Sequence, residues 1–176
     1  MWTSFIGFMA SGKSKVTANL LASTSRPGVS VDELVVQKRG CSIADIFESD
    51  GQAAFRKIEL EALQGMDPAR NLIVDTGGGV VETPAAVAVL RANGVVIWLD
   101  CSWEVVRARL KNSPKGVRPL VAELGWAGLE DLFRRRRPLY ASAADFRLRS
   151  EGDLENLSRT AMLRSIVWQR HTEKSK

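Results

Sequence analysis

The sequence predicts a three-layer α/β/α domain, in which helices cover both faces of a five-stranded parallel sheet. Short apolar stretches alternate along the chain with longer segments of helical periodicity. Such alternation is typical of β-α-β units, whose strands run parallel. The stretches at 73–74 and 95–99 contain no polar residue, as expected for strands that are covered on both faces. Right-handed crossovers between these strands then place helices on both sides of the sheet.

Turn and capping residues delimit the elements in order. Ser42 and Ser102 suit helix N-caps, Pro84 suits a first helical position, and Gly94 suits the end of the helix before it. The expected strands cover about 3–6, 28–31, 71–75, 95–99 and 145–149. The expected helices include 14–22, 55–63, 84–93, 102–111 and 153–169.

Composition places the chain among ordinary globular proteins. Its 176 residues are 45% hydrophobic and 26% charged, which suits one domain with a proper core. No internal repeat or long linker divides it, so we expect a single domain at 1–170 and a polar tail at 171–176. No apolar run approaches the ~18 residues of a membrane span, and no basic and apolar leader precedes residue 7. We therefore expect a cytoplasmic protein without a membrane partner.

Net charge and the rarer side chains narrow the chemistry. The formal net charge of +5 suits anionic small molecules, whereas scattered basic residues without an aromatic ladder argue against nucleic acid. Cys41 and Cys101 lack metal-ligand spacing and are expected to be buried, reduced thiols. The only histidine, His171, lies in the expected polar tail, so a general base must be a carboxylate.

The segment Gly7-Phe8-Met9-Ala10-Ser11-Gly12-Lys13-Ser14 matches G-x-x-x-x-G-K-[ST], the phosphate-binding loop of P-loop NTPases. Backbone N–H groups of such a loop and the positive end of the following helix surround phosphate oxygens. Lys13 would reach the β- and γ-phosphates, and the Ser14 hydroxyl would ligate Mg²⁺. The residues expected to bind a nucleoside triphosphate are Gly7, Ala10, Ser11, Gly12, Lys13 and Ser14.

Further polar groups follow the expected strands. Ligands of open α/β sheets bind at the carboxyl ends of the strands, and there the sequence has Asp32, the segment 75–79 and Asp100 besides the phosphate loop. The three consecutive glycines at 77–79 indicate either the close approach of a ligand or another backbone, or a loose turn. We therefore expect the second substrate at this edge of the sheet.

Two arginines fall on apolar helix faces. Arg56 lies on the apolar side of the expected helix 55–63, where it needs a partner, either Glu59 at i+3 or a bound carboxylate. In the run of arginines at 134–137, only Arg136 continues an apolar helical face, and the other three are expected to face water.

Together these segments resemble the shikimate kinase family, over about residues 5–149. The resemblance rests on the phosphate loop and on the segments 42–47, 55–59, 76–79, 117–120 and 136–140. It implies the fold of P-loop kinases of the nucleoside-monophosphate-kinase type, with an acceptor-binding region at about 32–63 and a mobile lid at about 112–124. It also implies that Mg²⁺ and ATP serve the phosphorylation of shikimate at its 3-hydroxyl, by an enzyme expected to be monomeric.

Position by position, the resemblance implies roles for individual residues. Asp32 would hydrogen-bond the acceptor's hydroxyls beside the attacking oxygen, and Lys13 and Arg118 would act with it in catalysis. Arg118 would close with the lid over the transferring phosphoryl group, and Lys111 would lie against adenine. The two arginines of the acceptor site would hold the carboxylate of shikimate, and the whole site would consist of Asp32, Arg56, Gly77, Gly78, Gly79 and Arg136.

The sequence departs from the family at the end of the second expected strand. The family usually has Asp-x-Asp there, but this chain has Ser30-Val31-Asp32, so the first carboxylate, which helps to hold the Mg²⁺ shell, is missing. Asp75 stands where the family usually has a small neutral residue. We hypothesise that Asp75 replaces the lost charge and holds Mg²⁺ through water, the alternative being that it only caps the glycine turn.

Two other functions stay open beside a shikimate kinase. One is a related kinase that uses a different polyhydroxy acid, such as gluconate. The other is a relative that binds its ligands but has lost turnover, which the serine at position 30 would explain.

Overall fold

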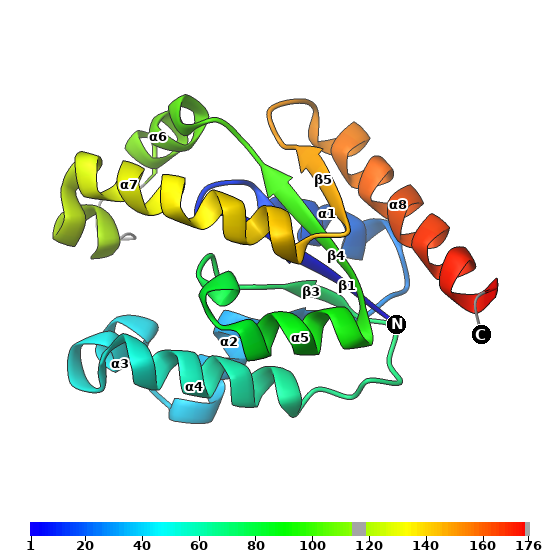
Figure 1. The fold of residues 1–176 in the computed structure, drawn as a ribbon, viewed down its shortest axis with the longest axis horizontal. Coiled ribbons are helices and arrows are strands. Elements are labelled where there is room, and N and C mark those ends of the chain that lie inside the picture. Colours follow the sequence, from blue (N-terminus) through cyan, green and yellow to red (C-terminus); the bar gives the residue numbers. More distant parts are fainter. Residues whose placement is uncertain (114–118, 175–176) are drawn as a thin grey trace.

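A computed structural model describes residues 1–113 and 119–174 of the chain (Figure 1). At its centre, five strands form one sheet of order β2-β3-β1-β4-β5, and all neighbouring strands are parallel. The strands are β1 (Trp2–Ile6), β2 (Gly28–Ser30), β3 (Ile73–Asp75), β4 (Gly94–Asp100) and β5 (Phe146–Arg149). The predicted five-stranded parallel sheet is confirmed, and each strand overlaps its predicted range.

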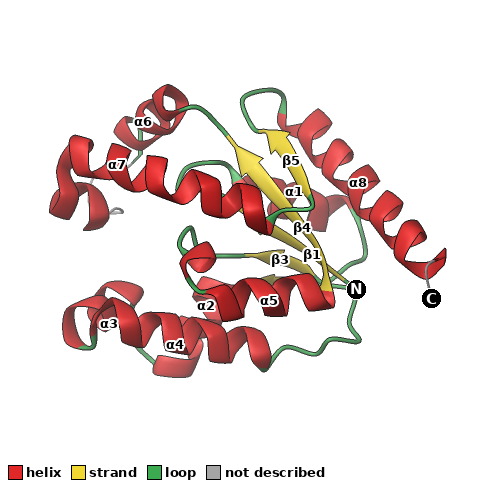
Figure 2. Cartoon of the chain, viewed as in Figure 1, coloured by secondary structure: helices red, strands yellow, loops and turns green. Residues whose placement is uncertain are grey.

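Helices lie on both faces of this sheet (Figure 2). They are α1 (Lys13–Ser23), α2 (Val31–Arg39), α3 (Ile43–Ser49), α4 (Gly51–Gln64), α5 (Pro84–Asn93), α6 (Trp103–Lys111), α7 (Pro119–Ala143), α8 (Leu154–Lys174) and the short 3-10 helix η1 (Val80–Glu82). Helices α1 and α8 cover one face, whereas α5 and α7 cover the other. The predicted three-layer arrangement is therefore confirmed. In the described part of the chain, none of the helices is both long and apolar enough to span a membrane.

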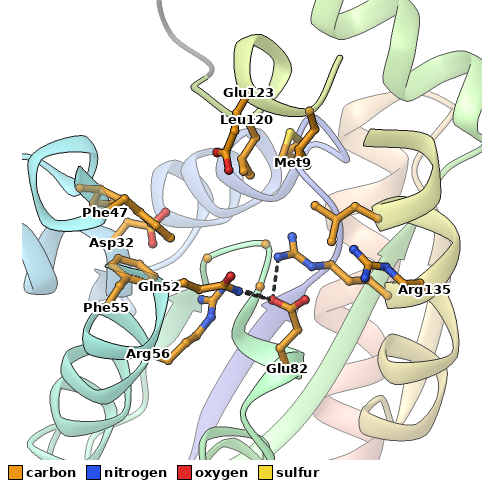
Figure 3. A pocket seen from close by; sticks show the side chains of 17 residues that line it. Met9, Asp32, Phe47, Gln52, Phe55, Arg56, Glu82, Leu120, Glu123 and Arg135 are labelled. Atoms are coloured by element: carbon orange, nitrogen blue, oxygen red, sulfur yellow. Dashed lines mark hydrogen bonds and ion pairs between the residues drawn. The ribbon is translucent and has the colours of Figure 1, made fainter. Parts of the chain in front are cut away.

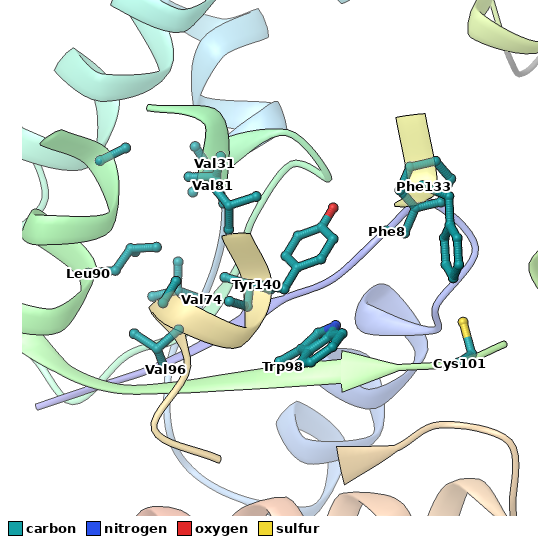
Figure 4. Packing of buried hydrophobic residues seen from close by; sticks show 14 of the residues in the cluster. Phe8, Val31, Val74, Val81, Leu90, Val96, Trp98, Cys101, Phe133 and Tyr140 are labelled. Carbon is teal, nitrogen blue, oxygen red and sulfur yellow. The ribbon is translucent and has the colours of Figure 1, made fainter. Parts of the chain in front are cut away.

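Strand β4 shows why its sequence lacks polar alternation. Ile97 and Leu99 pack into the core beneath α1 and α8, whereas Val96 and Trp98 pack into the core on the opposite face. Figure 4 shows the latter core, in which Trp98 stacks on Tyr140 of α7 at 5.9 Å between ring centroids. Because both faces of β4 are covered, every side chain along it is buried.

Helices α2, α3 and α4 share a third, smaller core. Val35, Ile46, Phe55 and Ile58 form it, and α3 is capped at Ser42 by a capping box. The burial of Phe55 and Ile58 fixes the rotation of α4. The residue between them that concerns the site, Arg56, is thereby turned toward the triple glycine.

Two of the boundaries that differ from the prediction have a local physical reason, and one helix is bent. The second strand ends at Ser30 rather than 31, because the Ser30 Oγ accepts a hydrogen bond from the Glu33 N–H at 3.3 Å and caps α2. The predicted polar tail at 171–176 begins inside α8, which continues to Lys174. No glycine or proline interrupts that stretch, and Gln169 and Glu173 are hydrogen-bonded at i+4. Helix α7 is bent at Gly125, whose φ is 63° and ψ is −178°.

Candidate active site

The phosphate loop joins β1 to α1 at the carboxyl edge of the sheet, as the sequence predicts. Gly12 caps α1 in the left-handed conformation, with φ of 100°, which favours glycine. The Lys13 ammonium donates hydrogen bonds to the carbonyl oxygens of Gly7 at 2.8 Å and Phe8 at 3.1 Å. The loop thus brings the N–H groups at the start of α1 and a buried cation to one place, as an anion site requires.

Asp75, the last residue of β3, lies beside the start of α1. Burial raises the pKa of its carboxyl, while a hydrogen bond with the Ser14 side chain and the charge of Lys13 act to lower it. On the neighbouring strand β2, the residue opposite Asp75 in the sheet is Ser30. Asp75, the predicted substitute for the missing carboxylate, therefore lies next to Ser30, the position at which the family resemblance leads us to expect that carboxylate.

The Ser14 hydroxyl and the Asp75 carboxylate are oxygen ligands of the kind that Mg²⁺ prefers. Within residues 1–113 and 119–174, no group of three or more His, Cys, Asp or Glu side chains could hold a metal ion. A hydroxyl with one carboxylate fits an ion that shares its shell with water and nucleotide phosphates instead of sitting in an all-protein cage.

Asp32 lies in the first turn of α2, between the phosphate loop and the acceptor region. Burial raises the pKa of its carboxyl. The charges of Lys13 and Arg56 act to lower it and that of Asp75 to raise it. Asp32 lines the same cavity as Arg56 and Met9 of the phosphate loop, and its Oδ1 lies by Gly77. Asp32 therefore lies near Lys13, which is predicted to bind ATP, and near Arg56, which is predicted to bind the acceptor.

The glycines after β3 make room for these groups. A β-carbon at Gly77 would lie 2.8 Å from Asp32 Oδ1 and 2.9 Å from Glu59 Oε1. A β-carbon at Gly78 would lie 3.3 Å from the backbone nitrogen of Met9 in the phosphate loop. The predicted close approach is confirmed, since functional side chains and another backbone pack against this turn.

Both predicted acceptor arginines reach the same turn. Arg56 pairs with Glu59 at 2.7 Å, which confirms one of its two predicted partners, and also with Glu82 at 3.2 Å. Arg136 is 4% exposed and pairs with Glu82 at 2.7 Å. A β-carbon at Gly79 would overlap the guanidinium of Arg56 and lie 3.0 Å from Arg136 Nη2.

A cavity of about 400 Å³ opens between these residues (Figure 3). Helices α2, α3 and α4 form one wall, η1 and the triple glycine form the floor, and α7 forms the other wall. Its lining residues include Met9, Asp32, Phe47, Gln52, Phe55, Arg56, Gly77, Gly78, Gly79, Glu82, Leu120, Glu123, Arg135 and Arg136. The predicted acceptor residues, which span more than 100 positions in sequence, therefore line one cavity.

The predicted lid is described in part. Its segment 114–118, with Arg118, lies outside the described residues. Asn112 caps the end of α6, and α7 begins at Pro119. Leu120 and Glu123, in the part of α7 before the bend at Gly125, line the acceptor cavity.

Two basic residues of α6, the predicted Lys111 and Arg109, have different neighbours. The Lys111 ammonium lies 5.9 Å from the ring centroid of Trp126, an ordinary cation–π contact. Arg109 instead donates to the carbonyl oxygens of Ala10 at 2.9 Å and Ser150 at 2.6 Å. Lys111 is assigned from the family resemblance, the sequence does not single out Arg109, and the contact of Lys111 with adenine stays a prediction.

Asp100 is not part of the site, although it ends β4 as predicted. Its carboxylate is buried and pairs with Arg137 at 3.1 Å and with Arg147. Arg137 also lies over the rings of Trp98 and Phe133, so the prediction that it faces water is wrong. The prediction of a buried thiol is confirmed for Cys101, whereas Cys41 is only half buried.

Glu82 is a charged residue of the cavity that the sequence analysis did not single out. It touches both acceptor arginines, yet lies 26 positions from Arg56 and 54 from Arg136. The sequence did contain a signal for Glu82, because this residue follows by three positions the glycine turn that is predicted to bind the acceptor. A charged side chain there has to face the site or the solvent.

Comparison with known proteins agrees with this geometry. The sequence model of the family described as shikimate kinase matches residues 9–166. A shikimate kinase of Synechococcus sp. (strain RCC307) is 42% identical over 149 residues, which make up 84% of this chain and 75% of that protein.

Two solved structures are similar over almost the whole chain. The crystal structure of shikimate kinase from Aquifex aeolicus VF5 has a TM-score of 0.75 and 34% identity, covering 93% of this chain and 94% of that one. Shikimate kinase from Acinetobacter baumannii in complex with shikimate has a TM-score of 0.81 and 26% identity, covering 98% and 94%. From the match of the family model and the identity of these relatives, the chain belongs to the shikimate kinase family.

Proposed function

We propose that this chain is an ATP-dependent shikimate kinase, which transfers the γ-phosphoryl group of ATP to the 3-hydroxyl of shikimate. The observation that carries the proposal is the position of Asp32, which lines one cavity together with Arg56, Arg136 and Met9 of the phosphate loop. A carboxylate at that place faces a donor phosphate on one side and an acceptor hydroxyl on the other. The relatives named shikimate kinase support the choice of acceptor.

The acceptor cavity suits a small molecule that combines a carboxylate with hydroxyl groups. Arg56 and Arg136 present guanidinium groups, which bind carboxylates bidentately and so fix their orientation. Asp32 accepts hydrogen bonds and suits hydroxyl groups instead. Shikimate would span these two ends, with its carboxylate at the arginines and its 3-hydroxyl at Asp32.

The reaction asks the protein mainly for alignment and positive charge. The 3-hydroxyl oxygen forms a new bond to the γ-phosphorus, while the bond to the β–γ bridging oxygen breaks and ADP leaves. Asp32 in its ionised form takes the proton of the attacking hydroxyl. Lys13 stabilises the charge that spreads over the transferring phosphoryl oxygens, and Arg118, on the lid, is proposed to add a second positive charge.

Mg²⁺ bound with ATP would neutralise part of the phosphate charge. Ser14 is proposed to ligate the ion and Asp75 to hold it through water, which their hydrogen bond and their place at the phosphate loop support. Gly7, Ala10, Ser11 and Gly12 are proposed to surround the phosphates, and Arg109, which contacts Ala10, to lie close to the bound nucleotide.

We further propose that the enzyme acts as a monomer in the cytoplasm, where ATP is available. Support for the monomer is that the donor and acceptor sites both consist of residues from this one chain. The reaction itself is tested by measuring ADP formation from Mg·ATP with shikimate, with gluconate or with no acceptor. We expect ADP release from Mg·ATP to depend on shikimate, with gluconate giving little more than the rate without acceptor.

The matched variant for this experiment is Asp32→Asn, which keeps the size of the side chain but cannot take a proton. Turnover with shikimate is expected to fall by about 100-fold or more, the range of general-base catalysis, while ATP still binds. ADP release that ignores shikimate, or that gluconate supports equally well, would contradict the assigned acceptor.

A further inference from the structure

The acceptor cavity already holds a carboxylate at the place where that of the substrate would bind. Glu82 ends η1, and its Oε2 accepts hydrogen bonds from Arg136 Nη2 at 2.7 Å, Arg56 Nη2 at 3.2 Å and Gln52 Nε2 at 3.4 Å (Figure 3). One oxygen of one protein side chain therefore contacts both arginines that are proposed to hold the acceptor.

The backbone of Glu82 is fixed, while its carboxylate stays accessible. Val80 and Val81 anchor η1 in the core at 0% and 5% exposure, whereas the Glu82 side chain is 26% exposed. Burial acts to raise the pKa of Glu82, but hydrogen bonds and charges of Arg136 and Arg56 bring this pKa below its ordinary value. Glu82 is thus a carboxylate at neutral pH, and rotation of its side chain can move it out of the arginine pair without moving η1.

The guanidinium groups of Arg56 and Arg136 use their donors in the same way. In Arg56 and in Arg136, Nη2 is bonded to Glu82, while Nε is buried and has no hydrogen-bond partner among the described residues. Nε and Nη2 together form the edge that can hold a carboxylate bidentately. Each Nη2 has two N–H groups, so a carboxylate ligand at either edge shares the Nη2 donor with Glu82 and lies close to its negative charge for as long as Glu82 keeps this contact.

We propose that Glu82 is an intramolecular competitor for the acceptor's carboxylate, and that its displacement from Arg56 and Arg136 limits the affinity for the acceptor. The inference rests on the proposed function, since it concerns how the same site takes a carboxylate acceptor. Binding exchanges one carboxylate for another on the same guanidinium edges, so the net gain is smaller than at an arginine pair with no competing carboxylate. An acceptor that lacks the negative charge gains little from the removal of Glu82.

Glu82→Gln tests this proposal, because it removes the charge and keeps the shape. Isothermal titration of the full chain with shikimate should give a dissociation constant about tenfold lower than that of the wild type, roughly the effect of one charge-assisted hydrogen bond. The methyl ester of shikimate should bind both proteins with similar affinity. ATP binding, measured in parallel, should be unchanged and shows that the variant is folded.

Glu130→Gln is the matched control. Glu130 and Arg134 form an ion pair within helix α7, and neither of them lines the acceptor cavity. The control therefore removes an arginine-paired carboxylate and changes the net charge equally, and it should leave the shikimate affinity unchanged. If Glu82→Gln does not bind ATP, Glu82→Ala is titrated in its place with the same expected outcome.

The outcomes separate this inference from the proposed function. Tighter binding of shikimate but not of its methyl ester supports competition by Glu82. Unchanged or weaker binding by the variant overturns it and makes Glu82 a residue that orients the arginines, while shikimate-dependent ADP formation by the wild type keeps the proposed function. If neither protein binds shikimate or forms ADP with it, both proposals fail.

Discussion

Ser30 and Asp75 stand opposite each other on the neighbouring parallel strands β2 and β3. The carboxylate on β3 is hydrogen-bonded to Ser14 of the phosphate loop, while the serine hydroxyl on β2 caps α2 by accepting from the Glu33 N–H. A negative charge that the family resemblance leads us to expect on β2 can therefore be supplied from β3, at the same edge of the sheet. This relationship makes the hypothesis for Asp75 testable by exchange of the two side chains.

We predict that Asp75→Ala weakens the use of Mg²⁺. The half-saturating Mg²⁺ concentration for turnover should rise about tenfold or more, as for the loss of an outer-shell ligand. Titration of Mn²⁺ into the ATP complex, followed by electron paramagnetic resonance, should show the same loss without turnover. The double variant Ser30→Asp/Asp75→Ala should recover much of it, and an unchanged metal dependence in Asp75→Ala would leave this residue as a cap of the glycine turn.

Asp32 is predicted to lower the stability of the folded chain at neutral pH. Because burial raises the pKa of its carboxyl, the group contributes its full stability below the pKa it has when unfolded, about 3.9, and this contribution is lost as the pH rises through the folded pKa. Asp32→Asn should therefore raise Tm at pH 7, by roughly 2–4 °C for each kcal/mol recovered. The difference should vanish as the pH falls toward 4, and a lower Tm of the variant at pH 7 would contradict the argument.

Arg136→Ala should weaken shikimate binding by about 1.5–3 kcal/mol, the value of a charge-assisted hydrogen bond. Arg134→Ala is its control, because the Arg134 side chain is 70% exposed and pairs only with Glu130 among the ion pairs of the described residues. Titration with shikimate should separate the two variants, while both keep their affinity for ATP. Equal losses would mean that general positive charge, and not the buried guanidinium, attracts the acceptor.

Gly79→Ala tests the packing of the triple glycine. The backbone of Gly79 has φ of −107°, which alanine adopts readily, so the variant adds only a methyl group that overlaps the guanidinium of Arg56. We expect KM for shikimate to rise about tenfold or more, because a small displacement of a bidentate contact loses much of its energy. ATP binding should persist. Gly152→Ala has no heavy atom close to its added methyl group, so its kinetics should match those of the wild type.

Arg109 and Lys111 are predicted to differ in nucleotide binding. Arg109→Met removes the contacts with Ala10 and Ser150 and should weaken ATP binding by about 1 kcal/mol or more. Lys111→Met loses the contact with Trp126 and should bind ATP almost as the wild type does. Titration with ATP in the absence of shikimate compares the two variants, and the reverse order of losses would contradict the role of Arg109 and support the one predicted for Lys111.

The elements of this fold follow closely from the chain alone. The phosphate loop, the five strands and the helix at 84–93 depend on neighbours within a few residues, through glycine φ angles, capping and apolar periodicity. The acceptor residues Asp32, Arg56 and Arg136 could also be named from the sequence, because each belongs to a segment that resembles a known family.

Contacts between distant segments were decided by the tertiary structure. Glu82 contacts Arg56 and Arg136, Asp75 stands opposite Ser30, and Arg109 reaches the phosphate loop. Each of these depends on strand register, on the rotation of a helix about its axis or on the path of a loop. Spacing along the chain does not determine such quantities, because they result from the packing of whole elements against one another. The sequence by itself therefore determined which chemistry the chain carries, and the packed fold decided which charges share the acceptor site.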